Sequence, residues 1–225
     1  NRLSDGQKIS VSRIIRHELY FQSESYHDIA IIVTESAIKF DKTVNIICIP
    51  ASDITVDQLV GRWSTVLGFG NVDYGGDLSQ ALKQIKVQII DTKDCADRYA
   101  IGDKHNIPIG IQECMICGNP GGSSDACQGD SGGPMSITLN GVHHLIGIVS
   151  FGRKCGTVRI PGVYTNRTVD GLLSVYVLKK STNSGELSII SMNALIGDLL
   201  TAFFSLISFK KRYFSCMESH LSLSA

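Results

Sequence analysis

The chain has 225 residues, and its 21 lysines and arginines balance its 21 aspartates and glutamates, so the formal net charge is zero. This balance argues against nucleic acid or an anionic membrane surface as the general partner. Hydrophobic residues make up 43% of the chain and charged residues 19%, a globular composition that excludes bulk disorder. The length is enough for one large or two small domains with a buried core.

From the N-terminus to about Thr168 the sequence indicates strands and turns. Ile9, Val11 and Ile15 fall on one face of a first strand. Further strands are predicted over residues 28–33, 45–50, 64–69, 82–90, 134–139 and 144–151. Residues 51–59 look like a connector, and the first helix pattern is Val169–Lys180. Many short strands between glycine-rich turns are typical of an all-β antiparallel barrel or sandwich.

Seven cysteines occupy positions 48, 95, 114, 117, 127, 155 and 216. Cys114 and Cys117 form the only Cys-x-x-Cys pair, whereas a zinc site would normally need a second one, so disulfides in an oxidising compartment are favoured. The odd count leaves at least one cysteine without a partner in this chain. No leader peptide is visible in residues 1–10, so we expect that Asn1 is not the natural start.

A serine between glycines carries the strongest chemical signal. Residues 125–134 read Asp-Ala-Cys-Gln-Gly-Asp-Ser-Gly-Gly-Pro. A serine nucleophile needs an exposed hydroxyl with backbone N–H groups aimed at the developing oxyanion. The flanking glycines let the N–H groups of Gly129 and Ser131 converge. A shorter motif would be read as a glycine-rich surface turn, but ten residues of this pattern favour a nucleophile.

This stretch closely resembles the chymotrypsin/trypsin family of serine proteases, and the supporting motifs follow in the family's order. They are residues 26–31, 45–50, Gly68-Phe69-Gly70, Ser150-Phe151-Gly152 and 161–164. The resemblance covers about residues 8–182 and implies two antiparallel β-barrels with the active site between them. Residues 1–50 would end the first barrel, 51–60 would connect the barrels, 61–182 would form the second barrel with a C-terminal helix, and 183–225 would be a tail.

The resemblance also implies the catalytic roles. Ser131 would be the nucleophile, with Gly129 and Ser131 forming the oxyanion hole. Asp28 would be the triad aspartate, although the residue by itself could equally be a strand-edge carboxylate. Asp130 would pair with a new N-terminal ammonium after zymogen cleavage, yet the chain has no Ile-Val-Gly-Gly-like segment to supply one.

The expected substrate is a protein or peptide with arginine or lysine at the cleavage site. Asp125 matches the base of the family's primary specificity pocket, and a carboxylate in a deep slot pairs with a basic side chain. Ser150, Gly152 and Gly162 would line this pocket. The mechanism requires no metal or cofactor, and the family is secreted.

The family's disulfides give expectations for most of the cysteines. Cys127 would pair with Cys155, and Cys95 with Cys117; Cys48 would tie the domain to an upstream pro-segment. Gln84 and Ile137 stand where the family often has a third bridge.

A general base is missing from this pattern. In the family the catalytic histidine precedes the aspartate, but His17 and His27 are the only histidines before Asp28, and neither has an Ala-Ala-His-Cys-like context. One explanation is a fragment of an active protease whose histidine lies upstream. The other is a non-catalytic homologue that binds partners. The intact Asp28, Asp125, Asp130 and Ser131 favour the first, and the chain by itself is predicted to be inactive.

Two features lie at or beyond the end of the resemblance. Asn166-Arg167-Thr168 is an N-glycosylation sequon. Residues 187–209 are strongly apolar, with Asp198 as the only charge. Three interpretations stay open for this segment, in descending order: an amphipathic helix, translated non-coding sequence, and a membrane span that Asp198 would disfavour.

Overall fold

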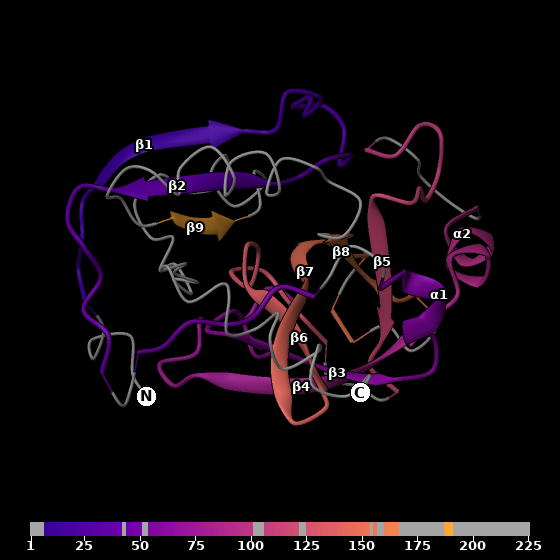
Figure 1. Cartoon of the computed structure of the whole chain (residues 1–225). Helices are drawn as coiled ribbons and strands as arrows, with labels where there is room; N and C mark the ends of the chain where they lie inside the picture. Colours follow the sequence, from indigo (N-terminus) through magenta and orange to yellow (C-terminus); the bar gives the residue numbers. More distant parts are fainter. Residues whose placement is uncertain are drawn as a thin grey trace, which may run out of the picture.

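The computed structural model describes residues 7–41, 44–50, 54–100, 106–121, 125–153, 155–156, 160–166 and 187–190. In this part of the chain the strands form a three-stranded sheet of order β1-β2-β9 and a closed six-stranded barrel of order β3-β4-β5-β8-β7-β6. Neighbouring strands are antiparallel in both, and the sheet lies beside the barrel (Figure 1). The all-β architecture with an antiparallel barrel, predicted from the sequence, is confirmed.

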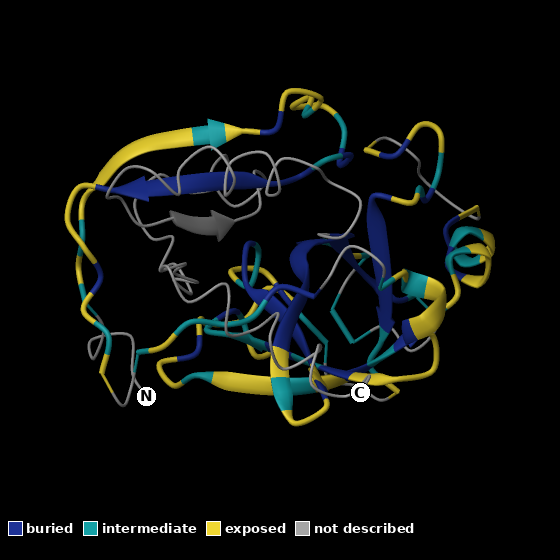
Figure 2. Ribbon diagram, in the orientation of Figure 1, coloured by how far each residue is buried: buried dark blue, intermediate teal, exposed yellow. Residues whose placement is uncertain are grey.

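The small sheet is built around β2 (Ala30–Thr34), which lies between β1 (Val11–Arg16) and β9 (Leu187–Ile190). All five residues of β2 are buried, whereas β1 is almost entirely exposed (Figure 2). This explains why β2 has a continuous apolar sequence, because both of its faces are covered.

The strand β9 lies at the start of the apolar segment 187–209. Residues 187–190 are extended and pair with 30–33 of β2. The rest of that apolar segment and the predicted C-terminal helix Val169–Lys180 lie outside the described residues. No helix among the described residues is long and apolar enough to cross a membrane.

The barrel has an apolar interior. Its strands are β3 (Trp63–Gly68), β4 (Lys83–Ile90), β5 (Met115–Asn119), β6 (Pro134–Leu139), β7 (Val142–Phe151) and β8 (Gly162–Asn166). Along β4, Val87 and Ile89 are buried while Lys86 points outward, the alternation expected of a strand with one buried face. The inward-facing side chains pack together as one core that includes Val66, Val87, Ile116, Met135, Ile146 and Tyr164.

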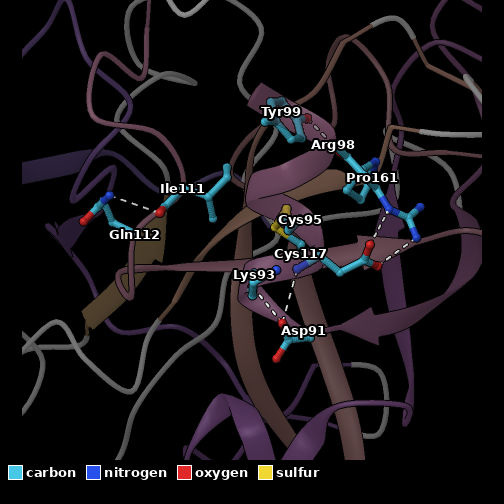
Figure 3. Close-up of a disulfide and its surroundings, with 10 residues drawn as sticks. Asp91, Lys93, Cys95, Arg98, Tyr99, Ile111, Gln112, Cys117 and Pro161 are labelled. Carbon is cyan, nitrogen blue, oxygen red and sulfur yellow. Dashed lines mark hydrogen bonds and ion pairs between the residues drawn. A yellow bond between two sulfur atoms is a disulfide. The ribbon is translucent and has the colours of Figure 1, made fainter. Parts of the chain in front are cut away.

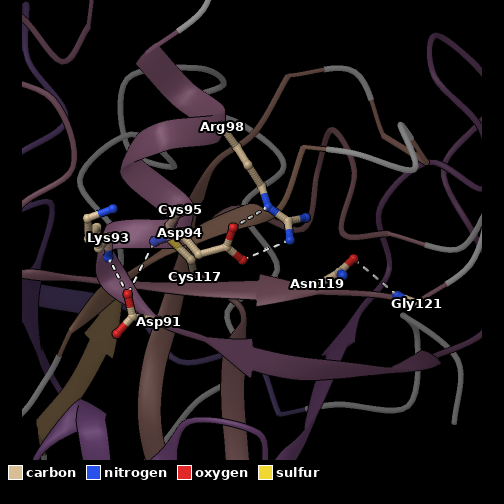
Figure 4. A network of polar contacts seen from close by, with 8 residues as sticks. All are labelled: Asp91, Lys93, Asp94, Cys95, Arg98, Cys117, Asn119 and Gly121. Carbon is tan, nitrogen blue, oxygen red and sulfur yellow. Dashed lines mark hydrogen bonds and ion pairs between the residues drawn. A yellow bond between two sulfur atoms is a disulfide. The ribbon is translucent and has the colours of Figure 1, made fainter.

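Two helices precede Thr168, contrary to the sequence-based prediction. The first, α1 (Val56–Leu59), is a single turn within the predicted connector. The second, α2 (Thr92–Ala100), begins where Asp91 Oδ1 accepts hydrogen bonds from the N–H groups of Lys93 and Asp94, at 2.8 and 3.2 Å. Its exposed side is held by an ion pair between Asp94 and Arg98 at 2.8 Å (Figure 4). Only Cys95 and Tyr99 are buried, so the helix has too few apolar residues for a periodic pattern.

Two further expectations are corrected by strand pairing. Residues 45–50 form no named strand, since only Cys48 makes an isolated bridge, to His144. Gln84 and Ile137 cannot be bridged, because β4 and β6 flank β3 on opposite sides. The β3–β6 register pairs Thr65 with Ser136, which places Ser64 opposite Ile137.

The sheet and the barrel share a second apolar cluster. Ile29, Ile31 and Val33 pack against Leu145 and Ile148 of β7 and against Ile49. The start of β2 is thereby pressed against the barrel, and this contact positions Asp28.

Candidate active site

Asp28 belongs to the segment that leads into the small sheet, but its hydrogen-bond partners lie on the barrel. It lies just before β2, with 0% of its surface exposed. The Ser150 hydroxyl donates to Asp28 Oδ2 at 2.5 Å, and the Thr165 hydroxyl donates to the Asp28 carbonyl oxygen at 2.8 Å. A buried carboxylate is tolerated when donors of this kind satisfy it. This placement is unlike that of a strand-edge carboxylate.

The two histidines that precede Asp28 contact each other. Their rings stack with centroids 4.7 Å apart and planes 11° from parallel. His27 lies in a turn with φ +50°, and the Ile29 N–H donates to its carbonyl oxygen at 2.7 Å. The Leu19 N–H donates to His17 Nδ1 at 3.1 Å, so that nitrogen is engaged locally. A left-handed non-glycine residue beside a buried carboxylate is the kind of strain found at functional sites.

Ser131 lies in a loop made of two successive tight turns. The Asp130 N–H donates to the Cys127 carbonyl oxygen at 3.0 Å, and the Gly133 N–H donates to that of Asp130 at 2.8 Å. The Gly132 N–H then donates to the Val149 carbonyl oxygen at 2.9 Å, which fixes the loop on β7. Ser131 is half-buried and faces the neighbouring cleft.

The N–H groups of Gly129 and Ser131 take no part in this network. Neither donates a hydrogen bond to an acceptor among the described residues. Gly129 has φ +90°, and a Cβ there would lie 2.6 Å from Leu78 Cδ2, so only glycine suits the position. Two such donors beside a serine hydroxyl can stabilise a developing oxyanion.

Asp130 is cradled by the segment Gly68-Phe69-Gly70. Its Oδ1 accepts from the Gly70 N–H at 2.7 Å and its Oδ2 from the Cys127 N–H at 2.9 Å. A Cβ at Gly70 would lie 2.5 Å from Asp130 Cγ, and one at Gly68 would collide with Oδ1. Burial raises the pKa of the Asp130 carboxyl, and the two N–H donors oppose that shift. Its pairing with an N-terminal ammonium stays a prediction.

A cleft of about 690 Å³ opens beside Ser131, and the residues expected to form the specificity pocket lie in its wall. Its lining includes Asp125, Ser131, Ser150, Gly152 and Gly162. Burial raises the pKa of the Asp125 carboxyl, although the N–H groups of Ala126 and Gly156 lower it. A Cβ built on Gly162 would lie 3.4 Å from Asp125 Oδ1, and one on Gly152 would lie 3.9 Å from Gly162 Cα. The two glycines therefore face each other above the carboxylate, which leaves room for a long cationic side chain.

Two disulfides brace this region. Cys127 and Cys155, with Cα atoms 5.2 Å apart, both line the cleft. Cys95 and Cys117, with Cα atoms 6.3 Å apart, join α2 to β5 (Figure 3). These are the two pairs that the family resemblance implied. Cys114 is a buried thiol and Cys48 is disulfide-bonded, so a pro-segment could attach through Cys48 only if that bond were exchanged.

Residues 1–170 match the sequence profile of the family named Trypsin. The chain belongs to the trypsin family. It is 35% identical over 154 residues to a protein named Venom protease from Bombus pensylvanicus, covering 68% of this chain and 60% of that protein. It is 37% identical over 164 residues to Trypsin eta from Drosophila melanogaster, covering 72% and 57%. It is 34% identical over 161 residues to Proclotting enzyme from Tachypleus tridentatus, covering 71% and 41%.

The chain thus spans about 60% or less of the length of these trypsin-family relatives. The family profile ends at residue 170, so the tail lies beyond the trypsin-family match.

The fold does not suit a glycan on Asn166. This residue is 0% exposed, its side-chain amide donates to the Glu113 carbonyl oxygen at 2.8 Å, and its N–H donates to that of Cys114 at 2.7 Å. An attached oligosaccharide would have to break these bonds and leave the barrel, so the sequon is incompatible with this packing.

Three contributions to the site were not predicted from the sequence. Ser150 was read only as a pocket wall, but it also hydrogen-bonds Asp28 across 122 positions of sequence. Thr165 holds the Asp28 backbone from 137 positions away, and Arg153 lines the cleft. Thr165 and Arg153 belong to none of the motifs named above, and the contact of Ser150 with Asp28 forms only in the folded barrel.

Proposed function

We propose that this trypsin-family chain is the greater part of a serine endopeptidase that cleaves proteins after arginine or lysine. The observation that carries the proposal is the shared cleft, which has Asp125 at its base, Gly152 and Gly162 facing each other above it, and Ser131 in its wall. A cationic side chain bound by Asp125 would hold the following peptide bond near the Ser131 hydroxyl.

The chemistry would follow from the placement of each group. Ser131 Oγ attacks the carbonyl carbon while a general base takes its proton, and the N–H groups of Gly129 and Ser131 bind the oxyanion. The base returns the proton to the leaving amine, which leaves an acyl-enzyme that water hydrolyses. Asp28 orients and stabilises the charged base. We propose that the base is a histidine supplied by sequence upstream of Asn1.

A non-catalytic homologue that binds partners is the second candidate. It is favoured by the positions of His17 and His27, which stack on each other, with one nitrogen of His17 bound to a backbone N–H. Three features argue against it: the hydrogen-bonded Asp28, the hydrogen-bonded Asp130, and the cleft that Asp125 shares with Gly152 and Gly162. A protein without catalytic activity would not need to retain all three.

We further propose that the protein is secreted as a zymogen. Two disulfides beside the site suit an oxidising compartment. The half-buried Asp130 carboxylate, held only by backbone N–H groups among the described residues, would gain a cationic partner from a newly cut N-terminus.

The test uses the protein encoded by the complete natural transcript, activated by limited proteolysis. We expect a fluorophosphonate to label Ser131 and peptides to be cut after arginine but not glutamine, with Ser131→Ala abolishing both. Asp125→Ser should remove the preference for arginine while labelling persists. A folded protein that resists the fluorophosphonate but still binds basic peptides would establish the non-catalytic homologue instead.

A further inference from the structure

A rigid aromatic platform stands beside the cleft. Tyr99, in the last turn of α2, is 2% exposed, and its hydroxyl donates to the Pro161 carbonyl oxygen at 2.8 Å (Figure 3). Its ring meets Phe151 edge to face, with centroids 6.0 Å apart. The Cys95–Cys117 disulfide fixes α2 to the barrel one turn earlier. Tyr99 therefore has little freedom to move.

Arg153 is held on this platform. Its guanidinium carbon lies 4.9 Å from the centre of the Tyr99 ring, and its Nη2 donates to the Tyr99 carbonyl oxygen at 3.3 Å. A guanidinium stacked on an aromatic face is placed before a ligand arrives, which lowers the entropy cost of binding. It is not an arginine that ranges freely over the surface.

The cleft consequently contains two opposite charges at different places. Asp125 and Arg153 both line it. Both charges act on the pKa of Tyr99, which is raised mainly by burial. Arg153 lowers this pKa and Asp125 raises it, so both side chains lie within electrostatic range of the Tyr99 hydroxyl. A ligand that fills the cleft completely would match both charges.

The edge of β7 offers a path between the two charges. Pairing of β7 with β6 ends at Ile148, whereas pairing with β8 continues to Phe151. Beyond Val149, the side of β7 away from β8 has no strand partner among the described residues. An extended peptide can add to such an edge. At about 3.4 Å per residue, a peptide whose basic residue lies beside Ser150 would bring a residue two or three places earlier beside Arg153.

We propose that Arg153 is a specificity-determining residue that binds an acidic side chain two or three residues before the cleaved arginine or lysine. This inference rests on the proposed function, since it assumes that a basic residue occupies the pocket over Asp125. It adds a substrate class: peptides with an aspartate or glutamate upstream of the basic residue.

The experiment measures equilibrium binding, so it does not depend on a general base. In the protein from the complete transcript, peptides displace p-aminobenzamidine, and the fluorescence of that probe is followed. The peptides are the amides Gly-Asp-Gly-Arg and Asp-Gly-Gly-Arg, each compared with its asparagine and lysine counterparts. We expect at least one aspartate peptide to bind about three- to tenfold more tightly than its asparagine counterpart, and the gain to shrink as salt rises.

Arg153→Glu should reverse the order, so that the lysine peptide binds best. The matched control is Lys86→Glu, which makes the same charge change on an exposed residue of β4 and should leave the order unchanged. Retained p-aminobenzamidine binding in both variants shows that the pocket over Asp125 is intact.

The two hypotheses fail in different ways. If Asp125→Ser leaves p-aminobenzamidine binding unchanged, the proposed specificity for basic residues is wrong. If binding depends on Asp125 but the aspartate, asparagine and lysine peptides bind equally well, only the role of Arg153 is overturned.

Discussion

At the scale of single residues, the site depends on buried carboxylates whose environments differ. Asp28 accepts a hydrogen bond from the Ser150 hydroxyl, and Asp130 accepts two hydrogen bonds from backbone N–H groups. Asp125 also accepts hydrogen bonds from backbone N–H groups, those of Ala126 and Gly156, but unlike Asp28 and Asp130 it lines the open cleft. Its place in the cleft, and not the type of its partners, therefore distinguishes Asp125, the carboxylate that we propose binds the substrate.

The raised pKa of Asp125 predicts a pH dependence of ligand binding. Burial is the main cause of the shift, so the carboxyl takes up its proton at a higher pH than the ordinary aspartate value of about 3.9. A cationic ligand needs the ionised form, so p-aminobenzamidine affinity should be full above the raised pKa and fall as the pH drops through it. Titration by fluorescence checks this.

The same shift has a consequence for stability in the absence of ligand. A carboxyl whose pKa is higher in the folded state contributes stability below its unfolded pKa and loses it as the pH rises through the folded value. Asp125→Asn should therefore be more stable than the wild type at neutral pH but not at pH 3. The control, Asp77→Asn, changes an exposed carboxyl and should alter neither curve.

Close packing around Asp130 gives a prediction for Gly70. Gly70→Ala places a Cβ 2.5 Å from Asp130 Cγ, so the carboxylate must move away from the N–H groups that hold it. We expect a loss of about 1–3 kcal/mol in the free energy of unfolding, measured with urea. Gly152→Ala is the control, because its Cβ would have no neighbour closer than 3.9 Å. Equal stability of the two variants would contradict the close packing of Gly70 against Asp130.

At the scale of secondary-structure elements, register decides which residues meet. The β3–β6 register places Ser64 opposite Ile137, and the Ser64 hydroxyl is buried without a hydrogen-bond partner. Gln84 instead pairs with Leu67 on the other side of β3. A resemblance at the level of motifs could not distinguish these alternatives, because the motifs do not fix the register between β3 and its neighbouring strands.

This register can be tested with paired cysteines. We expect Ser64→Cys with Ile137→Cys to form a disulfide, detected by mass spectrometry of the non-reduced protein, and to raise the melting temperature. Gln84→Cys with Ile137→Cys should keep two titratable thiols, since β3 separates the two strands. A bridge in the second pair and not in the first would show that the register is wrong.

At the scale of the whole molecule, the two sheets contribute unequally to the site. The barrel supplies Ser131, Asp125 and Ser150, whereas the small sheet supplies Asp28 through the cluster around Ile29 and Leu145. The barrel is closed, while the outer strand β1 of the small sheet is exposed along nearly its whole length. The position of Asp28 beside Ser150 therefore depends on the packing of the small sheet against the barrel.

Hydrogen exchange should show this asymmetry. Amides of β7 and β8, buried on both sides within the barrel, should exchange only through global unfolding. Amides of β1 should exchange through local opening, at least tenfold faster. Mass spectrometry of peptides from the exchanged protein makes the comparison, and equal protection of β1 and β7 would contradict it.

Some features of this protein were determined by sequence alone, because they depend on neighbours along the chain. The loop around Ser131 needs glycines at positions adjacent to the nucleophile, so a ten-residue motif was enough to predict it and the family. Strands such as β4 were predicted because alternating burial imprints a period of two on the sequence. The same locality explains why α2, with only two buried residues, was missed.

Other features were decided only by the tertiary structure. The hydrogen bond from Ser150 to Asp28 and the burial of Asn166 join residues that lie far apart in sequence, and no local pattern encodes such pairs. Arg153 acquires its fixed position from Tyr99, 54 residues earlier, through contacts that exist only when α2 is docked on the barrel. The placement of charges around this cleft is a consequence of packing, because distant side chains meet only when the sheet and the barrel pack together.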